Sequence, residues 1–241
     1  MISEVKISLK DAIRYPFLDL RIILIIGTVL FAISILNKLS LSNWESIIII
    51  LISHILIFLE MGYGTKIVYN GLLGEDRLPK FNKLFKLIWE GLKKYCIYII
   101  YASIMSFLFK YAKAYFLADN IPLAIICSIL FIFAYVLLIG SLLNRYENKG
   151  SFIKAFYYNE IYDLLKDIGA KDVLTILICA MIAQSFAISC FVDINPNTLS
   201  LIEIAFSVLT FFLAPITLIS TKRLISLNLR RVYSEKEIKL K

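Results

Sequence analysis

Six long apolar runs, separated by shorter polar segments, dominate the pattern of this 241-residue chain. Most reach the roughly 20 residues that a helix needs to cross about 30 Å of hydrocarbon. Each run is continuous, whereas a strand of a membrane barrel alternates apolar and polar residues over about ten positions. The pattern therefore predicts an all-α membrane bundle with six transmembrane helices, at about 22–39, 47–69, 95–116, 122–143, 173–192 and 202–219.

Two of these runs are less regular than the others. The first has only 15 uninterrupted apolar or small residues before Asn37, and the third meets Lys110 and Lys113 near its far end. We expect long lysine side chains to reach the interface there, or the bilayer to thin locally. The first run could also be a cleaved signal peptide, but the acidic residues in segment 1–21 do not fit a short positive leader, so we expect an uncleaved span.

The basic residues predict the orientation. The N-terminal segment, segments 66–94 and 144–172, and the tail 222–241 hold 23 of the 26 lysines and arginines, and the alternate side holds 3. Because cytoplasmic loops carry the excess of Lys and Arg, we expect both termini in the cytoplasm and the protein in the cell membrane, as one membrane domain over 1–241.

Amphipathic segments precede the three odd-numbered spans. In 81–95 and in 152–168, apolar side chains recur at spacings of three and four, with charged side chains opposite them. A weaker version lies in segment 1–21, where Pro16 ends or kinks the helix. We expect these segments to be interfacial helices in the headgroup plane.

The order of amphipathic segment, inward span, short outer loop and outward span recurs about every 75 residues. Phe81-x-Lys83-x-Phe85 and Phe152-x-Lys154-x-Phe156 stand at equivalent places before the second and third hairpins. This echo favours three repeated hairpins, arranged in parallel around an axis normal to the membrane.

Composition agrees with a lipid environment. The mean hydropathy is +0.80, and only 18% of the residues are charged. The net charge of +8 could suggest nucleic acid, but the bases flank apolar spans, so we expect the lipid bilayer as partner and no nucleic acid. A second copy of the chain or another membrane protein stays open as a further partner.

Polar side chains inside the spans are the candidate functional residues, because a charge there is costly. They are Glu60 and His54 in the second span and Gln184 in the fifth. Glu60 is interpreted first as a carboxylate paired with a neighbouring helix, and alternatively as a transport residue. His54 is interpreted first as a packing residue, and alternatively as a proton or metal site; Gln184 suits an interhelical hydrogen bond. Six residues of helix place Glu60 about 120° from His54, so one helix face does not unite them.

No catalytic, metal or cofactor site is predicted. The four cysteines, at 96, 127, 179 and 190, form no C-x-x-C pair and lie in apolar runs. Phosphate-binding, zinc-protease and serine-hydrolase motifs do not occur. Gly62-Tyr63-Gly64 matches part of a channel filter but lacks its preceding Thr-Val, so coincidence is favoured. Pro215 in the sixth span indicates a kink.

Several short motifs resemble those of a known family. They are, in order, Asp11-Ala12-Ile13-Arg14-Tyr15-Pro16-Phe17, then Glu60-Met61-Gly62-Tyr63-Gly64-Thr65-Lys66, and then Leu78-Pro79-Lys80-Phe81 before Glu90-Gly91-Leu92. The chain resembles a domain-of-unknown-function family of polytopic membrane proteins that is common in methanogenic archaea and some bacteria. The resemblance implies a multi-span membrane protein and assigns no activity, substrate or site residue.

The sequence therefore predicts a multi-pass membrane protein that is not an enzyme, and that serves as a membrane module in small-molecule or lipid handling. The alternative is a secondary transporter or channel in which Glu60 and His54 line a polar path.

Overall fold

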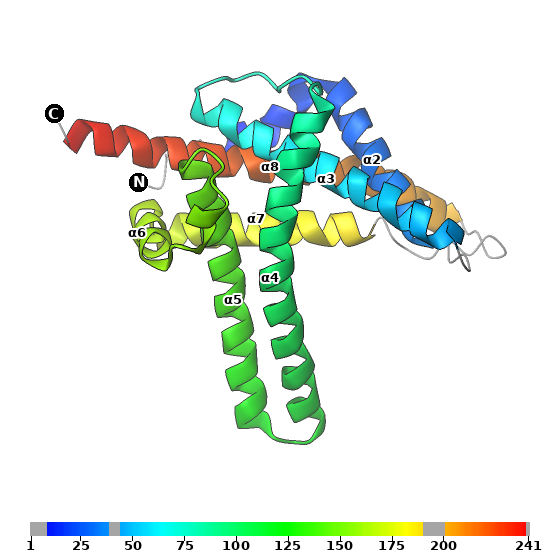
Figure 1. Ribbon diagram of the computed structural model, residues 1–241, viewed down its shortest axis with the longest axis vertical. Helices are drawn as coiled ribbons and strands as arrows, with labels where there is room; N and C mark the ends of the chain where they lie inside the picture. Colours follow the sequence, from blue (N-terminus) through cyan, green and yellow to red (C-terminus); the bar gives the residue numbers. More distant parts are fainter. Residues whose placement is uncertain (1–8, 39–43, 190–200, 240–241) are drawn as a thin grey trace. The chain divides into compact units, whose positions relative to one another are not determined.

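The computed structural model describes residues 9–38, 44–189 and 201–239. Every regular element in these ranges is a helix, which confirms the all-α prediction (Figure 1). Residues 9–14 are helical and lead into a short 3-10 helix. The elements that follow are η1 (Tyr15–Leu18), α2 (Leu20–Lys38), α3 (Trp44–Leu72), α4 (Leu84–Leu117), α5 (Ile121–Glu147), η2 (Ile153–Phe156), α6 (Tyr158–Ile168), α7 (Ala170–Ser189) and α8 (Leu201–Lys239).

Four to six of these helices are long and apolar enough to cross a membrane. Four qualify alone, and they lie in α3, α4, α5 and α8. Two further candidates are pairs of helices separated by a short break, in which residues 9–18 meet α2 at 88° and α6 is followed by α7 after Gly169. Each of the six spans expected from the sequence overlaps one of these helices over its described residues, so a polytopic helical bundle fits the chain.

The breaks in these two pairs have local causes. Pro16 lies in the 3-10 turn before α2, and the backbone at Asp19 is extended, so the first helix cannot continue. Gly169 ends α6 with a positive φ of +89°, a conformation that glycine adopts without strain. Both amphipathic segments therefore end before their spans begin, as the interfacial-helix prediction requires.

The segment 81–95 behaves differently, and the expectation of a separate interfacial helix there is wrong. Helix α4 begins at Leu84 and continues unbroken to Leu117. Segment 81–95 contains no proline and is rich in leucine and lysine, which favour helix. The first turns of α4 therefore continue into the span. Helix α8 likewise continues past the sixth predicted span to Lys239 and holds Pro215 within it.

One compact unit comprises residues 1–91 and 170–241. Its helices are α2, α3, α7 and α8, with the first turns of α4, and α8 packs against the other three long helices. Ile26, Tyr63, Ile67, Ala214 and Ile219 are fully buried in its core. We call this part unit 1.

The second compact unit, unit 2, comprises residues 92–169. Here α5 packs against η2 and α6. The apolar face of α6 is buried through Ile161, Leu164 and Ile168, as the amphipathic pattern predicts, whereas Ile153 and Tyr157 of the same predicted face are exposed. Lys154 of η2 forms an ion pair with Glu160. The hydroxyl groups of Tyr101 on α4 and Ser141 on α5 lie 2.7 Å apart.

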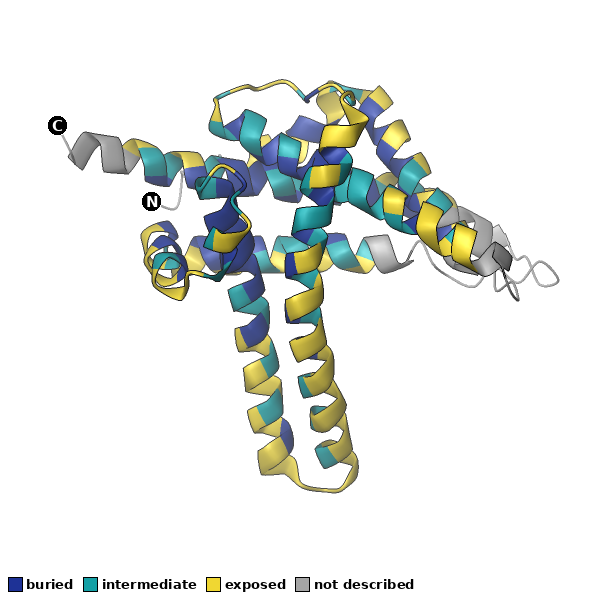
Figure 2. Ribbon diagram, viewed as in Figure 1, coloured by how far each residue is buried: buried dark blue, intermediate teal, exposed yellow. Residues whose placement is uncertain are grey.

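The α4–α5 hairpin of unit 2 carries much of the exposed apolar surface. The two helices run antiparallel and meet at residues 118–120, and the half of the hairpin near that turn is mostly exposed (Figure 2). Phe107, Phe109, Ile129, Ile132 and Phe133 are each more than half exposed. A water-soluble protein rarely leaves so large a contiguous apolar surface, so this face suits lipid.

The predicted repeat is only partly visible. All three hairpins are present, as α2–α3, α4–α5 and α7–α8. The first has a right-angled bend before its inward span, the third has a break at Gly169 there, and the second has no break. The arrangement of three hairpins about a common axis stays a prediction.

Candidate functional site

The non-helical segment between α3 and α4, residues 73–83, is held in place by side chains from distant elements of unit 1. Its alternate carbonyl oxygens, on Glu75, Arg77 and Pro79, accept hydrogen bonds. The donors are the Arg223 guanidinium at 3.0 Å, the Tyr15 hydroxyl at 2.9 Å and the Tyr63 hydroxyl at 2.8 Å. Donors from three different elements therefore hold this segment through its backbone.

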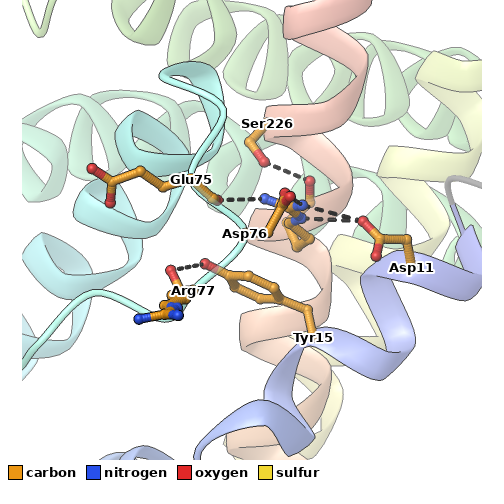
Figure 3. Close-up of polar contacts among 7 residues, drawn as sticks. Asp11, Tyr15, Glu75, Asp76, Arg77 and Ser226 are labelled. Carbon is orange, nitrogen blue, oxygen red and sulfur yellow. Dashed lines mark hydrogen bonds and ion pairs between the residues drawn. The ribbon is translucent and has the colours of Figure 1, made fainter.

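Arg223, on α8, is the centre of this arrangement and is only 2% exposed. Its Nη2 donates to Asp76 Oδ1 at 2.7 Å and to Asp11 Oδ2 at 3.2 Å. Its guanidinium carbon lies 4.5 Å from the centre of the Tyr15 ring. In Figure 3, dashed lines join the Asp11 carboxylate and the backbone carbonyl of Glu75 to one guanidinium, and the Glu75 side chain points away from it. A buried guanidinium needs such partners because an unpaired charge is costly to bury.

Three segments far apart in sequence are therefore joined by one cation. The N-terminal helix supplies Asp11 and Tyr15, the 73–83 segment supplies Asp76, and α8 supplies Arg223. The carboxylates are not deeply buried, since the side chains of Asp76 and Asp11 are 78% and 49% exposed. Such a network can fix the relative positions of three segments.

Tyr15 adds a neutral contact to the network. Burial is the main cause that raises the pKa of Tyr15 to about 12, and the nearby acidic side chains raise it further, while the positive charge of Arg223 opposes them. The phenol is therefore protonated at neutral pH and can donate to the Arg77 carbonyl. Its ring covers one face of the guanidinium.

Two glycines let α3 and the first turns of α4 approach backbone to backbone. A Cβ atom at Gly62 would overlap the carbonyl oxygen of Leu87, and one at Gly91 would overlap that of Phe58. Gly62 faces Leu87 as Gly91 faces Phe58, so the helices run antiparallel here. The Gly62-Tyr63-Gly64 sequence thus serves packing and loop anchoring, in agreement with the interpretation that its likeness to a channel filter is coincidence.

The contact between α3 and the 73–83 segment is completed by Lys66. Its Nζ donates to the Lys80 carbonyl at 2.6 Å and to Asn82 Oδ1 at 2.7 Å. Lys83 and Lys86 are close enough for their charges to repel that of Lys66. A positively charged surface therefore surrounds the start of α4.

Within the described part of the chain, no hydrogen bond or ion pair joins Glu60 to the other predicted polar residues of the spans. His54, half-buried on α3, contacts its own helix through Ile50 O at 2.7 Å and the Phe58 ring. Glu60, also half-buried on α3, makes no hydrogen bond or ion pair within the described part of the chain. Gln184 is half-buried on α7. The assignment of these side chains as candidate functional residues stays a prediction.

Metal-binding groups are not clustered either. Across the residues that the structure describes, no three His, Cys, Asp or Glu side chains are placed to hold an ion. Cys96, Cys127 and Cys179 are free thiols. Cys190 lies outside the described residues.

Comparison with known proteins identifies the family. A family model described as a protein of unknown function, DUF4013, matches residues 46–195, well over half of the chain. The chain belongs to the DUF4013 family. The matched region of this DUF4013 protein runs from α3 past α7 and includes Tyr63 and Asp76, but neither Asp11 nor Arg223. Among curated proteins and among solved structures, none matches the sequence.

The motifs behind the family resemblance explain part of the network. Tyr15, Tyr63 and Pro79 belong to them and take part in the hydrogen bonds of segment 73–83. Gly62 also belongs to them and allows the close contact between α3 and α4. Sequence reasoning missed Arg223, which counted only as one base of the tail. The available signal was its place directly before Leu224 and Ile225, at the inner end of the sixth predicted span.

Proposed function

We propose that this DUF4013 protein is a six-span integral membrane protein whose two termini lie in the cytoplasm. The apolar length of four helices and of two pairs separated by a short break supports the spans. The division of 23 basic residues against 3 supports the orientation. With six spans, the turn at residues 118–120 lies outside the cytoplasm.

We further propose that it works as a non-catalytic module that handles lipids or small molecules dissolved in the membrane. The amphipathic α6 ends at Gly169 before α7 begins, and residues 9–18 meet the apolar helix α2 at 88°. This break between an amphipathic segment and an apolar helix is the observation that carries the proposal. A helix so joined to a span lies in the headgroup plane. On α6, Tyr158 and Tyr162 stay exposed opposite the buried apolar face, where an amphipathic ring favours the interface. The bilayer is then the main partner, and nucleic acid is not one.

A second candidate function is a secondary transporter or channel. Glu60 favours it, because a half-buried carboxylate in a candidate span, with no ion pair among the described residues, is costly unless water reaches it. Against it, His54 contacts its own helix and does not share a face with Glu60.

Reconstitution into liposomes separates the two candidates. The native protein is expected to change the exchange of fluorescent phospholipids between leaflets or vesicles without releasing trapped solutes. Glu60→Gln and His54→Ala should leave this activity intact. Solute flux by the native protein, abolished by either substitution while the variant still elutes as a folded species, would establish the transporter in place of the lipid module.

A further inference from the structure

Six exposed residues at the start of α4 combine positive charge with large apolar side chains. We call them the α4 basic patch; they are Lys80, Lys83, Leu84, Phe85, Lys86 and Trp89. Phe85 is 86% exposed and Trp89 is 55% exposed. Large aromatic side chains left in water would be unfavourable, so this surface calls for a partner that accepts both rings and cations.

The charge of the patch is not neutralised within unit 1. Between residues 77 and 89 the ionisable side chains are Arg77, Lys80, Lys83 and Lys86, and all four are basic. The preceding acid, Asp76, is already bound to Arg223. The ammonium groups of Lys80, Lys83 and Lys86 form no ion pair or hydrogen bond with any residue that the structure describes. The patch therefore attracts an anion.

The packing of α4 on α3 shows which residues of the patch lie beside the polar end of α3 and which lie beside its apolar part. Asn82, next to Lys83, is bound by Lys66 near the polar end of α3, and Gly91 meets Phe58 further into the apolar part of the same helix. The lysines thus lie level with the polar end of α3, and Trp89 lies closer to its apolar stretch 47–59. At the boundary of a bilayer, lysine ammonium groups lie among the headgroups and aromatic rings lie closer to the hydrocarbon, which is the order found here.

We propose that the α4 basic patch binds the headgroup of an acidic phospholipid in the cytoplasmic leaflet, with Lys83 and Lys86 on the phosphate and Phe85 and Trp89 against the glycerol and upper acyl chains. The proposal deepens the proposed function, on which it rests, by naming the lipid class and the residues that select it. Basic clusters beside a membrane span bind anionic lipids through the same attraction.

Trp89 supplies a direct probe of this site. The chain has two tryptophans, Trp44 and Trp89, so Trp44→Phe leaves Trp89 as the sole indole. This variant is reconstituted into two sets of vesicles of the same composition, phosphatidylcholine with a minor fraction of phosphatidylglycerol. In one set the phosphatidylcholine is brominated and in the other the phosphatidylglycerol is brominated, because bromine quenches indole fluorescence. We expect brominated phosphatidylglycerol, mole for mole, to quench Trp89 more strongly.

Matched substitutions test the lysines. Lys83→Gln with Lys86→Gln should lower the relative binding constant for phosphatidylglycerol by about fivefold per lysine. Lys110→Gln with Lys113→Gln removes the same charge at the same spacing from the other end of α4, where both lysines are also exposed, and should leave the preference unchanged. The preference of the parent protein should also fall as salt rises, which needs no variant.

The outcomes are distinct. Equal quenching by the two lipids in the parent protein, or a preference that survives loss of Lys83 and Lys86, overturns the site while membrane insertion stands. Absence of quenching by either lipid, in protein that still floats with the vesicles, also overturns the site. Protein that fails to float with vesicles at all overturns the proposed function itself.

Discussion

Substituting alanine at Gly62 tests the closest helix contact in unit 1. The new Cβ would fall well inside the 3.0 Å that real Cβ atoms keep from other atoms, and the obstacle is the backbone carbonyl of Leu87, which cannot rotate away. The control is Gly64→Ala, two residues along the same helix. Its Cβ would meet the Lys222 side chain at 3.2 Å, and a flexible methylene chain can yield.

The magnitude follows from two opposing effects. Alanine in place of glycine favours a helix by about 1 kcal/mol, and overpacking a close contact costs about 1–3 kcal/mol. Separating α3 from α4 by about 1 Å disturbs many contacts, so the cost for Gly62→Ala is at the upper end of that range, for a net loss of about 1–2 kcal/mol. Gly64→Ala keeps the gain of up to about 1 kcal/mol. At about 2–4 °C per kcal/mol, the two Tm values should differ by about 5–10 °C.

Thermal unfolding in detergent measures this difference, with the fraction of monodisperse protein after heating as the readout. Gly91→Ala should resemble Gly62→Ala, because its Cβ would overlap the Phe58 carbonyl. One separation of the helices relieves both overlaps, so the double variant should lose less than the sum of the single losses. Equal Tm values for Gly62→Ala and Gly64→Ala, or full additivity of the two α3–α4 variants, would refute the antiparallel contact.

Three further predictions concern the segment 73–83. Arg223→Gln should lower the free energy of unfolding by about 2–3 kcal/mol, because charge-assisted hydrogen bonds are lost. The control Arg230→Gln, at an exposed position of α8, should change it by less than about 0.5 kcal/mol. Equal effects of the two substitutions in a melting experiment would contradict the network. Tyr63→Phe should cost about 1–3 kcal/mol because the Pro79 carbonyl loses its donor, and an unchanged melting curve would count against that bond. The raised pKa of Tyr15 means that its neutral phenol contributes stability below pH 10, which is lost as the pH rises through 10 to 12. Tyr15→Phe should therefore show a smaller loss of Tm between pH 9 and 11 than the native protein, and parallel losses would contradict the buried phenol.

The spans could be predicted from the sequence because an apolar run long enough to cross a bilayer has few alternatives. The breaks at Pro16 and Gly169 were also accessible, since proline and a helix-ending glycine act locally. The continuity of α4 was not, because the amphipathic pattern of 81–95 suits both an interfacial helix and the first turns of a span whose other face packs on α3.

The candidate site was mostly beyond sequence reasoning. Arg223 is separated from Asp76 by 147 positions and from Asp11 by 212, and no spacing rule relates them. Gly62 carried a visible signal, but its meaning depends on the carbonyl of Leu87, which only the packing brings close. By contrast, Glu60 and His54 could be selected by residue type alone, but in the described part of the structure they form no hydrogen bond with each other.

The sidedness of the α4–α5 turn tests the central claim most directly. A reporter that fluoresces only in the cytoplasm, joined to one that is enzymatically active only outside it, is inserted after Asn120 and, in a second protein, after Lys241. Six spans with both termini inside predict outside activity after Asn120 and fluorescence after Lys241. Fluorescence at both positions would contradict the account, because the α4–α5 hairpin would then not cross the membrane.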